Sequence, residues 1–118
     1  MPEGGELKGA PVIQKVYDLL LWIIPLIGRF PRLHRFLLGD RIEVKLLEIL
    51  DDLIEAYYTK SKEGLLRAAN LRCEQLRVLI RLCRDLGIIG MDKYTTASEK
   101  LDEIGRMIGG WKKSLGAR

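Results

Sequence analysis

The sequence predicts an all-α protein, an antiparallel up-down four-helix bundle that occupies residues 11–115. Apolar residues recur at intervals of three and four in four segments, and no segment shows the strict alternation typical of a strand. Short connections rich in Gly, Pro or Ser separate the segments, as in bundles with antiparallel neighbours. The 118 residues are 47% apolar and 31% charged, which indicates one globular domain.

The first helix is expected to begin at Pro11, because proline suits the first turn of a helix, and to end near Arg29. Pro25 lies inside it and lacks a backbone amide, so we expect a kink there. Phe30 and Pro31 mark the break that follows. The predicted buried stripe consists of Val12, Val16, Leu19, Leu20, Ile23 and Ile27.

The second helix is expected to start between Arg32 and Arg35 and to continue to about Tyr58. Gly39 falls on its apolar side, where a missing side chain permits a close neighbour or a local irregularity. The predicted buried stripe is Ile42, Leu46, Ile49, Leu50, Leu53 and Tyr57. The opposite side is acidic and consists of Glu48, Asp51, Asp52 and Glu55.

The third helix follows a polar connection at residues 59–64, with Ser61 as its expected N-cap, and ends at Leu86 before Gly87, a suitable C-cap. Its predicted buried stripe is Leu65, Ala69, Leu76, Leu79, Ile80 and Cys83.

The fourth helix has Asp92 and either Thr95 or Thr96 as alternative caps. Gly105 and Gly109 share one face, and two glycines there predict the close approach of another backbone. Its predicted buried stripe is Ala97, Leu101, Ile104, Ile108, Trp111 and Leu115. Residues 1–10 are predicted to be disordered and residues 116–118 to form a flexible basic tail.

Residues that could support catalysis or bind a metal are scarce. Cys73 and Cys83 are about 15 Å apart along one helix, too far for a disulfide, and are expected to be buried thiols. His34 is the single histidine, so neither a zinc site nor the Glu-x-x-His motif of bundle metal sites is predicted. We expect no cofactor, no metal and no enzymatic activity. The longest uncharged apolar run, residues 19–28, is about half the length that spans a bilayer, and no signal peptide is recognisable; a cytoplasmic location is therefore expected.

The third helix carries a second apolar stripe beside the first. A helix in a monomeric bundle buries a stripe roughly 100° wide, whereas this one is apolar over about twice that width. The second stripe therefore predicts an interface between copies of the chain, and contacts that close into a ring would bury it in every copy. It consists of Ala68, Leu71, Val78 and Leu82.

Basic residues gather in three places that favour an anionic partner. Arg77, Arg81 and Arg84 share one edge of the third helix, with Arg67 nearby, and guanidinium groups suit phosphate oxygens. The alternative is that these arginines pair with the acidic side of the second helix, in the same or a neighbouring subunit. The other two clusters are Arg29, Arg32, His34, Arg35 and Arg41 at the first corner, and Lys112, Lys113 and Arg118 at the end.

Both of these clusters also have simpler explanations. The first corner is equally consistent with a solvated connection, and the basic residues at the end interact favourably with a helix dipole. Trp22, Tyr57 and Trp111 fall on apolar stripes, so stacking on bases is not predicted. Nucleic acid, if bound, would be held mainly through its phosphate backbone and with little sequence readout.

Three stretches resemble the accessory variability determinant (Avd) proteins of diversity-generating retroelements. They are RFPRLHRFLLGDRI at 29–42, LRCEQLRVLIRLCRDLGII at 71–89 and EIGRMIGGWKKS at 103–114. A broader related group is the four-helix-bundle proteins encoded in intervening sequences of ribosomal RNA genes. The resemblance covers roughly residues 12–114.

The resemblance implies a barrel-shaped homopentamer with basic surfaces and no catalytic activity. Such proteins bind the reverse transcriptase of the retroelement and nucleic acid, template RNA or cDNA, and support mutagenic retrohoming. It assigns the binding of nucleic acid or polymerase to Arg77, Arg81, Arg84, Arg106, Lys112 and Lys113. The net charge of +4 and the acidic second helix depart from the strongly cationic members. This departure keeps open a second hypothesis, an oligomeric bundle that docks a protein partner without binding nucleic acid.

Overall fold

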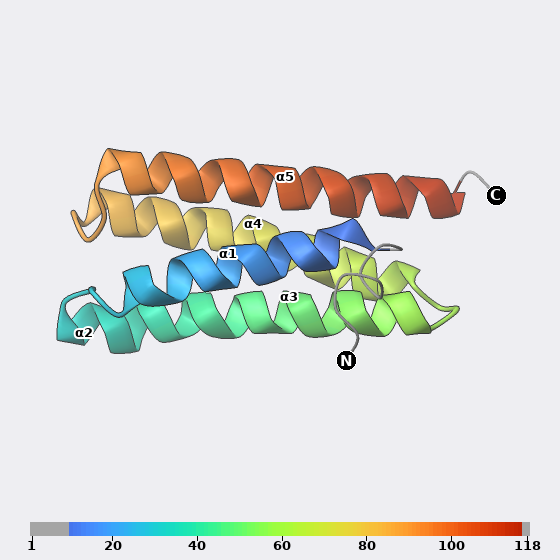
Figure 1. Ribbon diagram of the computed structural model, residues 1–118, viewed down its shortest axis with the longest axis horizontal. Helices are drawn as coiled ribbons and strands as arrows, with labels where there is room; N and C mark the ends of the chain where they lie inside the picture. The colour runs from blue at the N-terminus through green and yellow to red at the C-terminus, as the bar shows by residue number, and fades with distance from the viewer. Residues whose placement is uncertain (1–9, 117–118) are drawn as a thin grey trace.

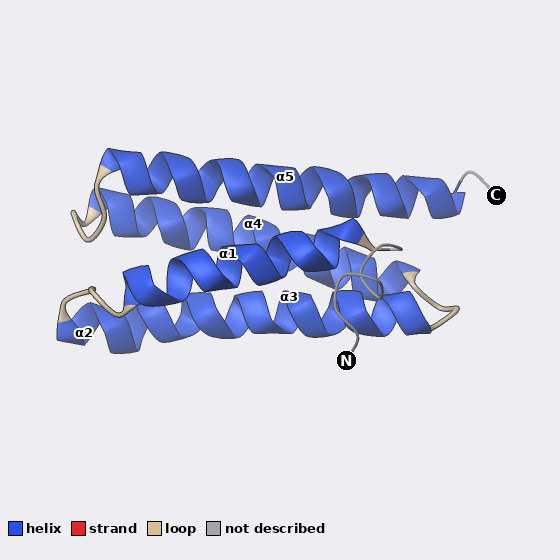
Figure 2. Ribbon diagram, viewed as in Figure 1, coloured by secondary structure: helices blue, strands red, loops and turns tan. Residues whose placement is uncertain are grey.

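The computed structural model describes residues 10–116, which form four long helices packed side by side (Figure 1). They are α1 (Pro11–Ile27), α3 (Asp40–Tyr58), α4 (Glu63–Asp85) and α5 (Met91–Gly116). A short helix α2 (Arg32–His34) and a π-helical turn η1 (Arg35–Gly39) lead directly into α3. Figure 2 shows helices joined by short loops, without strands, in the described part. The predicted four-helix bundle is confirmed.

Consecutive long helices run antiparallel, and each packs on two neighbours. α1 contacts α3 and α5, and α4 contacts the same two helices, so that α1 and α4 lie diagonally opposite each other. The helices follow the longest dimension of the molecule, 46 Å. Two ends result, one with the α1–α3 corner and the α4–α5 turn, the other with the α3–α4 connection. The predicted disordered start and basic tail fall almost entirely outside the described residues, although Ala10 is buried and Gly116 belongs to α5.

The core confirms most of the predicted stripes. All six predicted positions of α1 are buried, whereas Leu50, Tyr57, Trp111 and Leu115 are only half-buried at the margin of the core. The prediction was wrong at two positions of α4. Leu66 and Cys73 are buried in place of Leu65 and Leu79, which lie half-buried beside the core. Because α4 is apolar over much of its circumference, periodicity alone did not determine which residues face inward.

The ends of α4 show one wrong prediction and one confirmed prediction. Ser61 is not the N-cap, because α4 begins at Glu63 after Lys62 and has no side-chain cap. Lys62 instead holds the end of α3: its ammonium donates to the carbonyl of Ala56 at 2.6 Å and to that of Thr59. Gly87 closes the other end of α4 with φ of 75°, and the amide of the next residue donates to the carbonyl of Cys83 at 2.9 Å.

The start of α5 also differs from the prediction. The helix begins at Met91, so that Asp92, Thr95 and Thr96 lie in its first two turns rather than at its cap. The Thr96 hydroxyl donates back to the Asp92 carbonyl at 3.1 Å, inside the helix.

Gly39 confirms the predicted irregularity near the start of the second helix. It is the last residue of the π-helical turn, and it is buried against the end of α1. A Cβ atom at this position would lie 2.5 Å from Cγ2 of Ile27, which is too close for two carbon atoms unless one of them moves. The missing side chain therefore allows α2, η1 and α3 to pack closely on α1.

The prediction for Gly105 and Gly109 was wrong, because no backbone approaches them. A Cβ atom on Gly109 would meet nothing within 4 Å. At Gly105 it would lie 2.7 Å from Nη2 of Arg77, which is a side chain of α4. Gly105 thus leaves room for a guanidinium group rather than for a helix.

Candidate functional site

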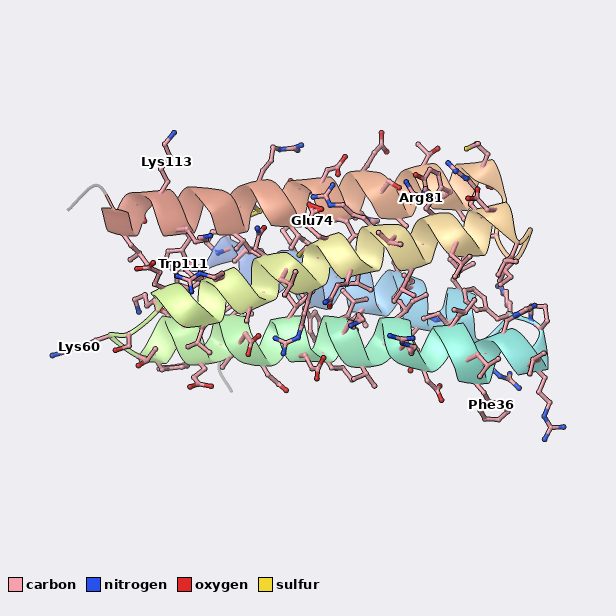
Figure 3. All side chains as sticks on the ribbon, turned by 180° about the vertical axis from the view of Figure 1, so that it is seen from behind. Phe36, Lys60, Glu74, Arg81, Trp111 and Lys113 are labelled. Carbon is pink, nitrogen blue, oxygen red and sulfur yellow. The ribbon has the colours of Figure 1, made fainter. Side chains whose placement is uncertain are left out.

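The arginine row of α4 is largely paired with carboxylates. Arg77 forms ion pairs with Asp102 of α5 and, through Nε at 3.3 Å, with Glu74. Arg84 pairs with Asp85 at 2.8 Å, and its guanidinium lies 4.4 Å from the ring centre of Tyr94. Arg81 is exposed and has no ion pair among the described residues (Figure 3). Asp102, on the neighbouring helix α5, is a partner that intrahelical spacing does not reveal.

The alternative was that arginines of this helix pair with the acidic side of the second helix. Arg72, which is not a member of the predicted row, does so. Arg72 reaches Glu48 at 3.3 Å and Asp52, both on α3. The exposed Arg67 pairs within α4, with Glu63 at 3.1 Å. The contacts of Arg72 join α4 to α3. Arg81 remains the member of the predicted row that is most available to a phosphate.

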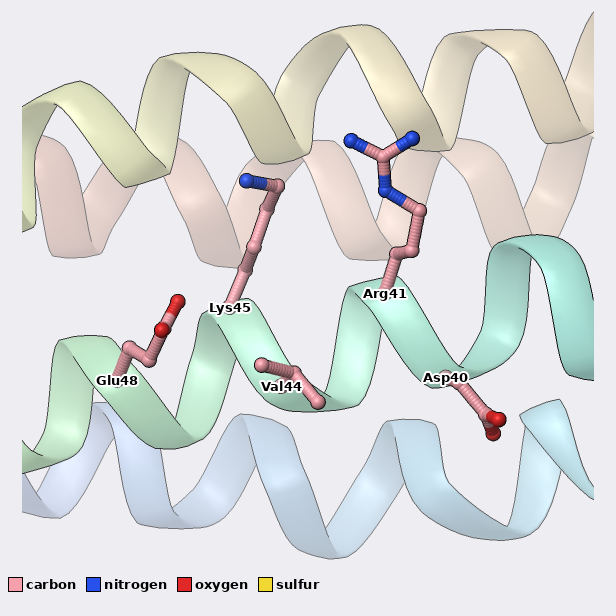
Figure 4. A pocket seen from close by; sticks show the side chains of 5 residues that line it. All are labelled: Asp40, Arg41, Val44, Lys45 and Glu48. Carbon is pink, nitrogen blue, oxygen red and sulfur yellow. The ribbon is translucent and has the colours of Figure 1, made fainter.

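At the α1–α3 corner, three of the four predicted arginines, Arg41 among them, are exposed without an ion pair to a described residue, and one is engaged. Arg29 and Arg32 are exposed, and neither has an ion pair within residues 10–116. Arg35 is half-buried and donates to the Gly28 carbonyl at 3.3 Å, so it serves the end of α1. Figure 4 shows Arg41 extending from α3 toward α4, on one side of a shallow depression that α3 residues line.

The predicted basic residues of α5 lie along its second half. Arg106 and Lys113 are exposed, and Lys112 is half-buried. None of the three forms an ion pair with a described residue. Lys113 stands clear of the helix near its end (Figure 3). Lys112 and Lys113 lie at the end of the bundle opposite to the corner arginines, whereas Arg106 lies nearer its middle.

The balance of charge changes along the bundle axis. The end with the α1–α3 corner and the α4–α5 turn, here called the basic end, carries an excess of cations over carboxylates. Its cations are Arg29, Arg32, Arg35, Arg41, Arg81, Arg84 and Lys93, and its carboxylates are Asp40, Asp85 and Asp92.

The middle of the bundle has the opposite balance. Its carboxylates are Asp18, Glu43, Glu48, Asp51, Asp52, Glu74, Glu99, Asp102 and Glu103. Its cations are fewer, namely Lys15, Lys45, Arg72, Arg77, Lys100 and Arg106. A polyanion is therefore attracted to the basic end and repelled by the middle.

The second apolar stripe of α4 is exposed in the single chain. Leu71 is 58% exposed, Val78 56% and Leu82 41%, while Ala68 is half-buried. Tyr17, Leu21 and Ile24 form another exposed apolar row, on α1. Because α1 and α4 are diagonal in the bundle, these two apolar rows lie on different sides of it. Further exposed apolar side chains lie on α2, η1 and α3, namely Leu33, Phe36, Leu37, Val44 and Leu47.

Within residues 10–116, neither the buried thiols nor the charged side chains form an arrangement suited to catalysis. Burial raises the pKa of Cys73 and of Cys83 to about 11, so both stay protonated at neutral pH and are poor nucleophiles. No group of three metal-binding side chains occurs in this part of the chain. Among the helices described, none is long and apolar enough to cross a membrane.

Comparison with families of known proteins gives a match that spans nearly the whole bundle. The family described as bAvd-like matches residues 12–115. The chain belongs to the bAvd-like family. No curated protein and no solved structure matches it. The resemblance inferred from the three stretches is thereby confirmed.

Two residues of this bAvd-like chain that sequence reasoning missed lie near the predicted sites. Lys93, in the first turn of α5, lines a depression together with Arg29 and Trp22. In an antiparallel bundle the start of the fourth helix lies at the same end as the corner cluster. The sequence could therefore have placed Lys93 near that cluster. Arg72 was missed because only the fold places it opposite Glu48 and Asp52.

Proposed function

We propose that this protein is a non-enzymatic accessory subunit of a diversity-generating retroelement, acting in the cytoplasm. It binds the reverse transcriptase and nucleic acid, either template RNA or the cDNA copied from it, and it supports mutagenic retrohoming. The observation that carries this proposal is membership of the bAvd-like family over residues 12–115.

The basic end supports contact with nucleic acid. Arg29, Arg32 and Arg81 are exposed there without ion pairs among the described residues, and each presents a planar fork of donors to phosphate oxygens. The exposed cations of α5, Arg106 and Lys113 with the half-buried Lys112, supply a second contact region. Contacts of this kind hold the backbone of a strand and carry little sequence information.

The exposed apolar rows of α1 and α4 support assembly into a ring. In a heterologous contact, the α4 stripe of one copy docks on a different surface of the next, and repetition closes the ring. The α1 row of Tyr17, Leu21 and Ile24 is suited to be that second surface, because it is apolar and exposed. Five copies would together carry a charge of about +20, which strengthens non-specific attraction to nucleic acid.

A salt series with matched variants tests the binding of nucleic acid. Arg29→Gln, Arg32→Gln and Arg81→Gln, combined, remove three cations that have no ion pair with a described residue, whereas Arg72→Gln removes one that is already paired. For duplex nucleic acid the slope of log K against log salt should fall by about 0.9 for each phosphate that the variant no longer binds. The triple variant should therefore have a smaller slope, and Arg72→Gln should not. An unchanged slope in the triple variant, with the oligomer intact, would reject these residues as phosphate ligands.

A second function, docking a protein partner without nucleic acid, is favoured by one observation. Four arginines of α4, namely Arg67, Arg72, Arg77 and Arg84, are paired with carboxylates. Co-purification of this protein with the reverse transcriptase, in the presence and absence of nuclease, distinguishes docking alone from binding through nucleic acid. Retention after nuclease together with no binding to RNA or DNA at low salt supports docking alone.

A further inference from the structure

A shallow depression at the basic end combines an aromatic ring with two cations. It is lined by Trp22, Pro25 and Leu26 of α1, by Arg29 just beyond that helix, and by Lys93 of α5. Its volume is about 170 Å³, and it lies along the seam between α1 and α5. The fold brings the start of α5 to the end of α1, which explains why residues so distant in sequence meet here.

The apolar part of this depression is anchored in the core. Trp22 and Leu26 are half-buried and pack against the core cluster, so that one side of each is fixed and the other lines the depression. Pro25 is exposed beside them. An indole held in this way needs little reorganisation to receive a flat ligand.

The charged part of the depression is free for an anion. Arg29 and Lys93 are exposed, and neither has an ion pair within the described part of the chain. No carboxylate lines the depression. Lys93 is the third residue of α5, so the amides at the start of that helix lie close to it and add a partial positive charge.

We propose that this depression binds one nucleotide of a single strand, with the base stacked on Trp22 and the adjoining phosphate held by Arg29 and Lys93. Aromatic faces beside basic side chains are what single-strand binding sites use, because every base has a face that stacks. A duplex keeps its bases stacked on one another and cannot offer one to Trp22. This inference rests on the proposed binding of nucleic acid, and it adds a preference for unpaired over paired strands.

Tryptophan fluorescence of the full chain tests the stacking directly. The chain has two tryptophans, so Trp111→Phe leaves Trp22 as the only indole. We expect an unstructured RNA oligonucleotide to quench Trp22, and a duplex of the same sequence to quench it far less even when anisotropy shows that the duplex is bound. AMP should quench only at much higher concentration, because it lacks the neighbouring phosphates.

Each result that differs from this expectation has a defined meaning. A single strand that binds without quenching, or a duplex that quenches equally, overturns the inference and leaves the proposed function standing. Quenching by AMP at the concentration needed for the oligonucleotide overturns the assignment to a strand, in favour of a free nucleotide. Absence of any nucleic-acid binding overturns the inference and the proposed nucleic-acid contact together.

Substitutions separate stacking from charge. Trp22→Leu should weaken single-strand binding by about 5- to 100-fold while duplex binding is unchanged. Trp111→Leu, at the opposite end of the bundle, is the matched control and should have no effect. Since Trp22 also packs on the core, Trp22→Phe is a second variant that keeps an aromatic ring and should retain most of the affinity. Unchanged single-strand affinity in folded Trp22→Leu contradicts the proposal.

The charge is tested by Arg29→Gln combined with Lys93→Gln, both at exposed positions. This double variant should lower the single-strand salt slope by about 0.7 for each phosphate that the two residues bind.

Discussion

Individual glycines of this bundle have different physical roles. Gly39 is buried, and a Cβ atom there would collide with Ile27 at 2.5 Å, so glycine is required for helix packing. Gly109 is exposed, with nothing within 4 Å of the corresponding position, so no neighbour requires glycine. Both lie in helical segments, and only the fold distinguishes them.

Gly39→Ala should therefore destabilise the protein. The added methyl group requires Ile27 or the π-helical turn to move, and overpacking of this kind costs about 1–3 kcal/mol. Gly109→Ala is the matched control and should stabilise the helix by up to about 1 kcal/mol. Urea denaturation of the two variants measures both. Equal stability of Gly39→Ala and the unmodified protein would contradict the close packing at this corner.

The two cysteines predict how stability depends on pH. Burial raises their pKa to about 11 from an ordinary value of 9.0. Between these two values the folded state holds the thiol protons more tightly than the unfolded state does. The unfolding free energy is therefore undiminished below pH 9 and declines as pH rises toward 11.

Double replacement of Cys73 and Cys83 by alanine should remove that decline, at the expense of stability at neutral pH. Urea titrations between about pH 8 and pH 11 measure it, with the decline of the unmodified protein as reference. In the native protein at about pH 8, a thiol reagent should react only upon unfolding. Rapid labelling of either thiol without denaturant would show that it is accessible.

Among the elements, α4 illustrates what sequence predicts and what it does not. The presence of the four long helices and the role of Gly87 were predictable, because periodicity and the positive φ of a helix end are local properties. The inward stripe of α4 was only partly predictable, since Leu65 and Leu66 both fit an apolar surface and contacts with α3 and α5 decide between them.

The partners of the candidate site depended even more on the fold. Arg77 meets Asp102, and Arg72 meets Asp52, only because neighbouring helices are placed in register. The proximity of Trp22 and Lys93 has the same origin. Arg81 was correctly placed on an edge of α4, but its availability could be judged only once its neighbours had been paired with carboxylates.

Arg72→Met tests the difference between a structural and a binding arginine. Its guanidinium joins α4 to two carboxylates of α3, and it is more buried than Arg81. We expect a loss of roughly 1 kcal/mol in unfolding free energy, because the side chains remain partly solvated, and no change in the salt dependence of RNA binding. Arg81→Met should show the reverse, unchanged stability and a smaller salt slope. A smaller slope for Arg72→Met would place this residue in the RNA contact.

At the scale of the whole molecule, polar and apolar surfaces are divided in a way that suits an assembly. Cations dominate the basic end, carboxylates the middle, and exposed apolar rows occupy α1 and α4 on different sides. A ring that used both rows would cover them. Assembly would thereby multiply weak phosphate contacts through effective concentration.

Val78→Glu should disrupt that assembly without unfolding the bundle. Val78 is 56% exposed in the single chain, so a carboxylate there is tolerated by the protomer but not in an apolar contact between copies. Light scattering should give a lower mass than for the unmodified protein, with helical content unchanged by circular dichroism. Thr95→Glu, exposed on α5, adds the same charge elsewhere and should leave the mass unchanged. A monomeric unmodified protein would contradict the proposed ring.

The proposed function is tested most simply by a binding titration of the unmodified protein against RNA over a series of salt concentrations. If the basic end binds phosphates, log K falls linearly with log salt, by about 0.7 to 0.9 for every phosphate bound, and the combined replacement of Arg29, Arg32 and Arg81 reduces that slope. Failure of the folded protein to bind any RNA or DNA at low ionic strength would contradict a role in holding nucleic acid.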